Sequence, residues 1–570
     1  MRLPRLLVAV LVCGSALAAG VVTPPSASGG PTAPATSEGY TASTAGDGPR
    51  ATRTSDTGPP GERAQSGPTV RAIYPDPVAG GDRGEFVVLE LPENTTLGRY
   101  TLTDGDTSVA LPNRTVGGRV ALSRDPAAVR NLTDRRVVGL DSAPALANGG
   151  DTVALSRAGR TVDSVRYDDT EEGELGVVRG STVQWRPLGA TDRPVVSGRA
   201  GEVRAFTLPD SPEAPLAPVQ NATERVYLAG YTLSSSRVAD ALVAAERRGA
   251  RVRVRLEGEP VGGRTRTEAR TLDRLRRTGV EVRVLAGPRA RYRYHHAKYA
   301  VADDRAVVMT ENWKPAGTGG ASSRGWGVAT SQPRVVEGLA ETFRADAGWR
   351  DAVDWREFRR GRSFQRGDPA NGSYPSRFDA TTVPVERTEL LVTPDNAEGR
   401  LVGTIDGATD SVDVVQPSVG GWDEPLLRAL RRAAKRGVEV RLLLSSAWYV
   451  REENRETVER FRSWADRTGA PLTARLAEPG DRYAKIHAKG AIVDGDRVVL
   501  GSLNWNEQAA SVNREVVLLL HGTAVADYYA SVFAADWSGG REPVPLGLLA
   551  AVVGALVVAA LAARRVRFAS

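Results

Sequence analysis

Residues 294–303, Tyr-His-His-Ala-Lys-Tyr-Ala-Val-Ala-Asp, contain the pattern His-x-Lys-x4-Asp, which runs from His296 through Lys298 to Asp303. A second copy begins 191 residues later and reads His-Ala-Lys-Gly-Ala-Ile-Val-Asp over residues 487–494. The chain has four histidines, and two of them occupy matching positions in these copies. Alternate residues of a strand point to the same face, so each histidine should project together with its lysine. The repeated pattern therefore predicts one site to which both copies contribute.

Strands and helices alternate around both copies in the same order, which indicates an internal duplication. Apolar residues spaced three and four apart, followed by a glycine, mark the helices. This alternation predicts a mainly parallel sheet, covered by helices, in each half. The expected strands are 225–230, 252–256, 280–285, 299–301 and 306–309, then 389–393, 412–416, 438–444, 491–493 and 497–500; the expected helices are 235–248, 267–277, 424–435 and 451–468.

The paired histidines and lysines suit the cleavage of a phosphodiester bond. That reaction needs a nucleophile, a proton for the leaving oxygen and positive charge beside the non-bridging oxygens. One histidine can attack phosphorus while the other protonates the leaving group and later activates water. The two lysines would hold the non-bridging oxygens, and hydroxyl and amide groups on the next strands can add hydrogen bonds.

The second copy completes a longer pattern, His-x-Lys-x4-Asp-x6-Gly-Ser-x-Asn, and by it the chain resembles the phospholipase D superfamily. The resemblance covers residues 223–540. It implies two copies joined about a pseudo-twofold axis, one site at their interface, a phosphohistidine intermediate, and neither a metal nor another cofactor. The matching residues are His487, Lys489, Asp494, Gly501, Ser502 and Asn504, with Glu515 at the position of a downstream acid.

The first copy departs from this pattern after its aspartate. Thr310 and Asn312 still supply a hydroxyl and an amide, but Met309 replaces the glycine. No acid corresponds to Glu515, because a glycine or a tryptophan (325–326) falls at that position. These losses predict weaker positioning of the first histidine, with the nucleophile and the lysines kept.

The resemblance makes His296 the nucleophile and His487 the general acid and base. The reverse assignment stays open, because Glu515 occurs only in the second half and would orient His487 for attack. Asp303 and Asp494 are interpreted as orienting or structural groups around the histidines. The predicted catalytic set is His296, Lys298, Asp303, His487, Lys489 and Asp494, and the predicted supporting set is Thr310, Asn312, Ser502, Asn504 and Glu515.

Residues 68–170 contain short β-rich runs separated by turns, which predicts a β-sandwich. Within them, residues 73–77, 84–91 and 100–104 resemble the lamin-tail domain, an immunoglobulin-like sandwich. Nothing in this segment indicates catalysis, so an accessory domain that positions or binds is expected. Residues 171–222, with Pro and Gly at intervals, are expected to form a connector.

A basic connector, 351–386, joins the predicted halves 223–350 and 387–540. Arginines and aromatic residues alternate in it, which is typical of a platform for phosphate or single-stranded nucleic acid. A solvated basic loop is the alternative. The arginines are Arg356, Arg359, Arg360, Arg362, Arg366 and Arg377, and the aromatic residues are Trp355, Phe358 and Phe364.

The two ends of the chain carry targeting signals. Residues 1–20 have arginines, an apolar run and an Ala-x-Ala site, which predicts a secretory signal peptide. Residues 21–67 lack large apolar residues and are expected to be a disordered linker. Residues 546–563 are uncharged and precede arginines, which predicts a transmembrane helix with the preceding chain outside the cell. An uncleaved N-terminal anchor, a lipidated Cys13 and a processed C-terminal sorting signal are the alternatives.

The amino-acid composition indicates which kinds of molecule the protein would bind. The net charge is +7, and 75 Lys and Arg residues include only five lysines. Arginine binds phosphate bidentately, so this bias suits anionic partners, although GC-rich codon usage would produce it too. Cys13 is the only cysteine, so the mature protein has neither a disulfide nor a thiolate metal site.

Two interpretations of function follow. The first is an exported, membrane-anchored phosphodiesterase, monomeric because both half-sites lie in one chain. Phospholipid is its expected substrate, and extracellular nucleic acid is the alternative. The second is a surface protein whose degenerate site binds phosphate ligands without turnover.

Overall fold

The computed structural model describes residues 67–79, 81, 83–180, 182–286, 291–367 and 370–539. The predicted signal peptide (1–20), almost all of the predicted linker (21–67) and the predicted transmembrane helix (546–563) lie outside these residues. Among the helices of the described part, none has the length and apolar character that a membrane span requires.

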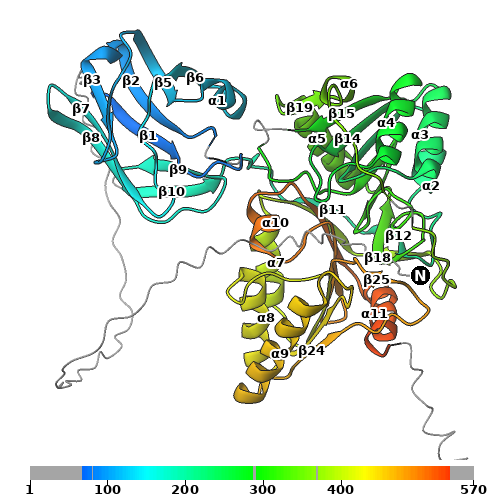
Figure 1. Cartoon of the computed structure of the whole chain (residues 1–570). Coiled ribbons are helices and arrows are strands. Elements are labelled where there is room, and N and C mark those ends of the chain that lie inside the picture. Colours follow the sequence, from blue (N-terminus) through cyan, green and yellow to red (C-terminus); the bar gives the residue numbers. More distant parts are fainter. Residues whose placement is uncertain are drawn as a thin grey trace, which may run out of the picture. The chain divides into compact units, whose positions relative to one another are not determined.

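Two β-sheets make up the first part of the described chain (Figure 1). Their strands are β1 (Thr69–Tyr74), β2 (Phe86–Thr96), β3 (Tyr100–Thr103), β4 (Ser108–Ala110), β5 (Thr115–Ser123), β6 (Arg136–Gly139), β7 (Asp151–Arg157), β8 (Arg160–Tyr167), β9 (Glu174–Arg179) and β10 (Thr182–Pro187), with η1 (Leu97–Arg99) and α1 (Pro126–Leu132) between them. One sheet has the order β10-β9-β1-β2-β5-β6 and the other β4-β3-β7-β8. Ile73 and Leu89 from the first sheet share a core with Leu102 and Leu155 from the second. The β-rich prediction is confirmed, and the immunoglobulin-like class stays a prediction.

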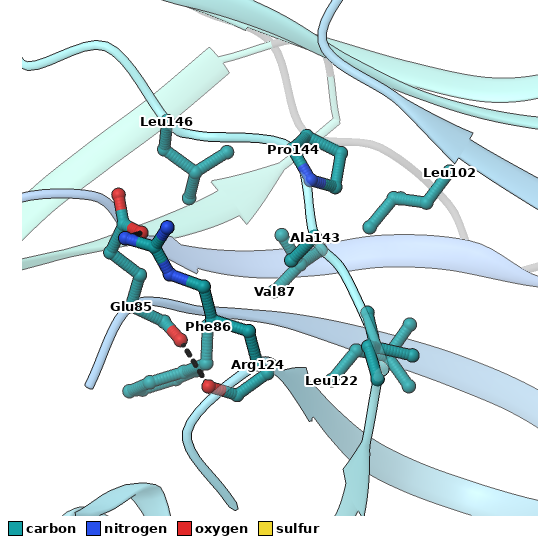
Figure 2. Close-up of a pocket in the computed structure, with 11 residues that line it drawn as sticks. Glu85, Phe86, Val87, Leu102, Leu122, Arg124, Ala143, Pro144 and Leu146 are labelled. Atoms are coloured by element: carbon teal, nitrogen blue, oxygen red, sulfur yellow. Dashed lines mark hydrogen bonds and ion pairs between the residues drawn. The ribbon is translucent and has the colours of Figure 1, made fainter. Parts of the chain in front are cut away.

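A small cavity lies inside this β-rich region (Figure 2). Its volume is about 10 Å³, which is room for about one water molecule. It is therefore too small to hold a substrate. Its lining includes Phe86, Leu102, Leu122, Pro144 and Leu146.

The first half of the duplicated region is built on a ten-stranded sheet. Its strands are β12 (Gly201–Leu208), β13 (Arg225–Gly230), β14 (Arg251–Glu257), β15 (Glu281–Leu285), β16 (Tyr299–Ala302), β17 (Arg305–Met309), β18 (Ser323–Thr330), β19 (Ala352–Asp354), β20 (Thr381–Val385) and the short β25 (Lys485–Ile486). The order is β19-β15-β14-β13-β16-β17-β18-β12-β20, and β25 pairs with β18. The helices are α2 (Ala217–Gln220), α3 (Ser236–Arg247), α4 (Arg266–Arg277), α5 (Pro333–Gly348) and α6 (Trp355–Phe358).

The second half has an eight-stranded sheet. Its strands are β11 (Val196–Gly198), β21 (Arg387–Val392), β22 (Ser411–Gln416), β23 (Glu439–Leu444), β24 (Leu472–Leu476), β26 (Gly490–Val493), β27 (Arg497–Gly501) and β28 (Val516–His521). The order is β11-β21-β28-β27-β26-β22-β23-β24. The helices are α7 (Ala397–Asp406), α8 (Pro425–Lys435), α9 (Arg451–Thr468), α10 (Glu507–Ser511) and α11 (Thr523–Trp537).

The two sheets repeat one topology, so the predicted duplication is confirmed. The run β15-β14-β13-β16-β17-β18-β12 corresponds strand for strand to β24-β23-β22-β26-β27-β28-β21. The prediction of mainly parallel sheets is wrong. Strands are parallel where helices cross over, as in β13-β14-β15 and β22-β23-β24. The other neighbours in the two strand orders are antiparallel, and among them hairpins join β16 to β17 and β26 to β27.

The predicted connectors supply strands to these sheets. In 171–222, β9 and β10 extend the first sheet of the β-rich region, β11 pairs with β21, and β12 pairs with β18. Because β12 is the counterpart of β21, the first half begins at residue 201, ahead of the predicted 223. In 351–386, β19 and β20 close the two edges of the first sheet. These segments join the sheets through backbone hydrogen bonds. A sequence pattern rich in Pro and Gly does not reveal such pairing.

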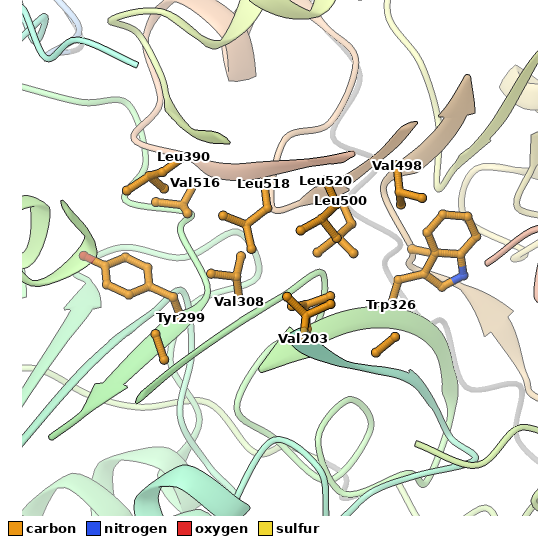
Figure 3. Packing of buried hydrophobic residues seen from close by; sticks show 14 of the residues in the cluster. Val203, Tyr299, Val308, Trp326, Leu390, Val498, Leu500, Val516, Leu518 and Leu520 are labelled. Carbon is orange, nitrogen blue, oxygen red and sulfur yellow. The ribbon is translucent and has the colours of Figure 1, made fainter. Parts of the chain in front are cut away.

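The halves pack through a shared hydrophobic cluster (Figure 3). Val308 and Trp326 of the first sheet and Leu500 and Leu518 of the second are almost fully buried in it. Full burial of each such side chain stabilises the packing by roughly 1.5–3 kcal/mol. The two sheets therefore form one rigid base for the segments that they carry at this interface.

Two buried ion pairs cross the interface at matching positions. Arg514 Nη2 lies 3.1 Å from Asp346 Oδ1, and Arg324 Nε lies 2.9 Å from Asp536 Oδ2. Each arginine belongs to one half and each aspartate to the other. Removing one partner of a buried pair strands a charge and costs roughly 3–5 kcal/mol. These pairs hold the segments around Arg514 and Arg324 against the opposite half.

Candidate active site

The two motif histidines are anchored to opposite halves. The backbone N–H of His296 donates to the carbonyl of Arg514 at 2.9 Å, and the N–H of His487 donates to the carbonyl of Arg324 at 2.9 Å. Lys298 affects the pKa of His487, and Lys489 affects that of His296. The two copies therefore meet in one site.

The motif lysines are buried beside their histidines. Lys298 Nζ donates to the carbonyl of His296 at 2.5 Å, and Lys489 Nζ donates to that of His487 at 2.8 Å. Burial lowers the pKa of Lys489 to about 8, and it lowers that of Lys298 well below its ordinary value. A bound anion would restore the charged form of both lysines, so this arrangement suits a phosphate between the histidines.

A buried carboxylate of the second half orients His296. The Nδ1 atom of His296 lies 2.9 Å and 3.0 Å from the two carboxylate oxygens of Glu515, and Asn513 Nδ2 donates to Glu515 Oε1 at 3.1 Å. Tyr231 packs edge-on against the imidazole, with ring centroids 4.8 Å apart. The expectation that Glu515 would orient His487 is wrong, because the interface brings the acid of one half to the histidine of the other.

Protonation at this first pair follows from its burial and charges. Burial alone would raise the pKa of Glu515, but His296 and Lys298 outweigh it and lower that pKa. Burial lowers the pKa of His296 to about 4, against the attraction of Glu515. The ring is therefore neutral at pH 7, and the ionised carboxylate accepts a hydrogen bond from Nδ1–H. The unprotonated Nε2 atom is left available for attack.

Glu311, a residue that the sequence patterns did not single out, supplies the acid beside His487. Its Oε2 atom lies 3.3 Å from His487 Nδ1. Burial raises the pKa of Glu311 to about 7 although Lys489 and three other lysines oppose it. Burial, followed by Lys489, lowers the pKa of His487 well below its usual value. When this second pair holds a proton, the proton therefore lies on the carboxyl of Glu311 and not on His487.

The acid of the first half has moved along the chain. Gly325 precedes Trp326 on β18 and corresponds to Glu515, which directly precedes β28, whereas Glu311 corresponds to Leu503. A Cβ atom on Gly325 would lie 2.3 Å from Glu311 Cγ. The Glu311 side chain thus fills the space that an acid at position 325 would need. As predicted, the first half has no acid at the position that corresponds to Glu515. Glu311 supplies a carboxyl beside the histidine from a different position in the chain.

The two motif aspartates lie outside this site. Asp303 accepts hydrogen bonds from the backbone N–H groups of residues 223–225 at 2.9 Å, and Asp494 accepts them from residues 409–411 at 2.8–3.1 Å. Seven residues separate each aspartate from its histidine, which is about 23 Å of extended chain. Their catalytic assignment is therefore wrong, because the carboxylates tie a hairpin turn to the start of the neighbouring strand.

The hydroxyl residues connect the site to the strands behind it. Thr310 Oγ1 accepts from the backbone N–H of Trp326 at 3.0 Å, and Ser502 Oγ accepts from that of Val516 at 3.0 Å. Asn312 is buried, and its Oδ1 atom has no hydrogen-bond partner among the described residues. Asn504 is partly exposed. Thr310 and Ser502 position the backbone, while Asn312 keeps an acceptor free.

Comparisons with known proteins identify the class. Residues 216–347 and 401–537 match the family model described as cardiolipin synthase, PLD-like domain. Mitochondrial cardiolipin hydrolase of Xenopus laevis is 29% identical over 145 residues, which are 25% of this chain and 62% of that protein. The chain thus spans less than two thirds of this relative. The two matched segments carry the two histidine motifs, so the duplicated region matches the phospholipase D superfamily.

Solved structures include similar folds. Phosphatidylserine synthase from Haemophilus influenzae aligns with a TM-score of 0.44 and 14% identity, over 61% of this chain and 88% of that one. Nuc from Salmonella typhimurium, described as a phospholipase D family member, aligns with a TM-score of 0.24 and 18% identity, over 27% of this chain and 98% of that one.

Proposed function

We propose that this protein is a phospholipase D-type phosphodiesterase that hydrolyses phospholipids through a phosphohistidine at His296. The observation that carries the proposal is the buried acid beside each histidine: Glu515 contacts His296, and Glu311 contacts His487. The pKa of Glu515 is lowered and that of Glu311 is raised, so the first acid favours His296 with a proton on Nδ1, and the second, when protonated, favours His487 with a proton on Nε2. One imidazole is prepared to attack and the other to donate a proton.

In the first step His296 Nε2 attacks phosphorus, and the bond from phosphorus to the leaving alcohol oxygen breaks. His487 Nε2–H gives its proton to that oxygen, while the Glu311 carboxyl passes its own proton to His487 Nδ1. Lys298 and Lys489 stabilise the charge on the non-bridging oxygens. Glu311 acts through His487 and is a positioning residue that also stores a proton.

In the second step water attacks the phosphohistidine. His487 accepts a proton from the water through Nε2, and its Nδ1 proton returns to Glu311. The bond between phosphorus and His296 Nε2 breaks, which releases a phosphomonoester and restores both histidines. The same pair of groups therefore serves as acid and then as base.

The surroundings of the site favour a lipid. Trp448 and Tyr449 follow β23 and are 74% and 45% exposed, and Val261 follows β14 in the other half and is 55% exposed. Tyr449 accepts a hydrogen bond from Lys485, two residues before His487, and Val261 N–H donates to Tyr231 beside His296. Exposed aromatic and apolar side chains on both sides of a site suit the interface of a bilayer.

The basic connector gives less support to a nucleic-acid substrate. Its aromatic residues Trp355 and Phe358 are buried in the core of the first half, so their faces are not available to stack on bases. Arg359, Arg362 and Arg377 are engaged in ion pairs with acidic side chains. The alternative of a solvated basic segment accounts for these contacts.

The predicted setting of the enzyme forms part of the proposal. The apolar segment 546–563 would anchor the protein, with the signal peptide directing the catalytic region out of the cell. The β-rich region would serve as a lamin-tail-like accessory domain. A single chain would suffice for activity, because it supplies both histidines and both acids.

Purified full-length protein in detergent micelles tests the proposal. We expect hydrolysis of phosphatidylglycerol in the presence of EDTA, and loss of it in His296→Ala and His487→Ala. The Lys435→Met variant, which changes a lysine at the end of α8, is the control for expression and folding. Turnover of single- or double-stranded DNA without turnover of lipid would favour the nuclease. Binding without any turnover would favour the degenerate phosphate-binding protein.

A further inference from the structure

Lysines gather at one side of the site. The chain has five lysines among 75 Lys and Arg residues. Lys298, Lys314, Lys485 and Lys489 all influence the pKa values of Glu311 and His487. The fifth, Lys435, ends helix α8. The proposed mechanism uses only Lys298 and Lys489, so it gives no role to Lys314 and Lys485.

Lys485 extends the row of side chains that carries His487. Lys485 begins β25, two residues before His487, and both Lys485 and Lys489 lie close enough to His487 to lower its pKa. Two residues of a strand span about 6.6 Å, which places Lys485 one step outward from the scissile phosphate. The corresponding residue of the first half is Tyr294, so the cationic row extends only on the His487 side.

Tyr449 holds the Lys485 side chain in place. Lys485 Nζ donates to Tyr449 Oη at 3.1 Å and lies 4.9 Å from the centre of that ring. A cation over an aromatic ring is stabilised without being neutralised. Tyr449 therefore fixes the position of Lys485 without occupying it with a carboxylate, which leaves the side chain available to an anion.

Lys314 approaches from the other half. It follows the turn that begins at Asn312, whose carbonyl accepts from the Lys314 backbone N–H at 2.8 Å. Within the described residues, neither Lys314 nor Lys485 forms an ion pair with a carboxylate. Burial, followed by repulsion from Lys485, lowers the pKa of Lys314. Glu311 and Glu268 attract Lys314 without forming an ion pair with it. Two ammonium groups that have no carboxylate in direct contact are suited to an anion that arrives with the substrate.

We propose that Lys485 and Lys314 form a second anion subsite, which binds a second phosphate in the headgroup of a phospholipid substrate. This inference rests on the proposed lipid hydrolysis. Trp448 is exposed and directly precedes Tyr449, which contacts Lys485. An exposed aromatic side chain at this place favours a lipid headgroup over a nucleic-acid backbone as the source of that phosphate. The subsite would select lipids whose headgroup ends in phosphate.

Binding of the headgroup tests the subsite independently of turnover. Calorimetry on the full-length protein in micelles compares glycerol 1,3-bisphosphate with glycerol 3-phosphate. We expect the bisphosphate to bind at least about tenfold more tightly, in line with one added charge-assisted contact. Lys485→Met and Lys314→Met should each reduce this preference to threefold or less. Lys485→Arg should keep much of it, and Lys435→Met should keep all of it.

Kinetics then connects the subsite to the reaction. Phosphatidylglycerol and phosphatidylglycerol phosphate share the same scissile bond, so the ratio of their KM values reports the second phosphate. The wild type should have the lower KM for phosphatidylglycerol phosphate, and Lys485→Met should bring the ratio close to one. Equal binding of the two glycerol phosphates, or an unchanged preference in Lys485→Met, would overturn the subsite.

The two proposals fail in different ways. Preferential binding of glycerol 1,3-bisphosphate without hydrolysis of either lipid would keep the subsite and reject the proposed function. Hydrolysis of both lipids with equal KM values would keep the function and reject the subsite. If Lys485→Met weakened the binding of an oligonucleotide but not of the bisphosphate, the lipid assignment would be wrong.

Discussion

The two half-sites share a histidine and a lysine but differ in the acid behind each histidine. His296 contacts Glu515, an ionised carboxylate held by Asn513, with distances of 2.9 Å and 3.0 Å. His487 lies 3.3 Å from Glu311, whose pKa is raised to about 7. In the proposed mechanism this difference assigns the two roles: the acid with the lowered pKa lies beside the nucleophile, and the acid with the raised pKa lies beside the proton donor.

Removing the histidines should produce the largest effect. His296→Ala loses the nucleophile, and we expect activity on phosphatidylglycerol to fall by about 10⁴-fold or more. His487→Ala loses the proton donor, at a cost of about 10²–10⁴-fold. With bis(p-nitrophenyl) phosphate, whose leaving group departs without a proton, only His487→Ala should recover the first step, seen as a burst of p-nitrophenol followed by slow turnover. Recovery in His296→Ala instead would exchange the roles.

The same substitution in the two acids should have unequal results. Glu515→Gln removes the charge that orients His296, so kcat should fall on the order of 10²-fold at every pH. Glu311→Gln cannot pass a proton to His487, so its activity should fall at pH 7 but persist at acidic pH, where His487 itself becomes protonated. Steady-state rates from pH 4 to 9 measure both variants. Parallel profiles for the two would contradict the division of roles.

Moving the acid back to its matching position should restore function. Glu311→Leu, which reproduces Leu503 of the other half, should lose about tenfold or more in kcat. Adding Gly325→Glu should recover part of that loss, because the second half accommodates the same combination, Leu503 with Glu515. Gly325→Glu alone is the matched control and should be impaired by the 2.3 Å contact. A double variant no better than Glu311→Leu would mean that Glu311 does not replace the missing acid.

The pH profile of the wild type should show the smallest of these effects. The pKa of His296 is lowered to about 4, so the nucleophile is neutral above that pH. The pKa of Glu311 is raised to about 7, so its proton is present below that pH and lost above it. We therefore expect kcat/KM to be highest between about pH 4 and 7 and to decline through pH 7. A rate that keeps rising above pH 8 would refute this assignment.

Much of the fold, and the histidines and lysines of the site, could be predicted from the sequence. Fixed spacing predicted both histidines and both lysines, and hydrophobic periodicity located strands such as β13 and helices such as α9 at or near their observed bounds. Two patterns were misleading. Asp303 and Asp494 belong to the motif, yet they bind backbone N–H groups far from the histidines. The first half begins with β12, and this strand was not predicted because the chain that follows it is rich in proline.

The pairing of acids with histidines could not be read from the sequence. Glu515 is near His487 in the chain but contacts His296, because each half presents its acid to the opposite half. Glu311 occupies a variable position of the pattern, and only the close approach of Gly325 to its side chain reveals the exchange. Lys485 and Lys314 stood out only after folding had brought four of the five lysines together.

The identity of the phosphorylated residue tests the central claim most directly. The His487→Ala variant, in which hydrolysis of the intermediate lacks its base, is mixed with bis(p-nitrophenyl) phosphate, quenched and digested, and the labelled peptide is located by mass spectrometry under alkaline conditions. The proposed mechanism predicts a p-nitrophenyl phosphoryl group on His296, with one p-nitrophenolate released. The same group on any other residue of this variant, or on His487 in the reciprocal His296→Ala variant, would contradict the assignment of His296 as the nucleophile.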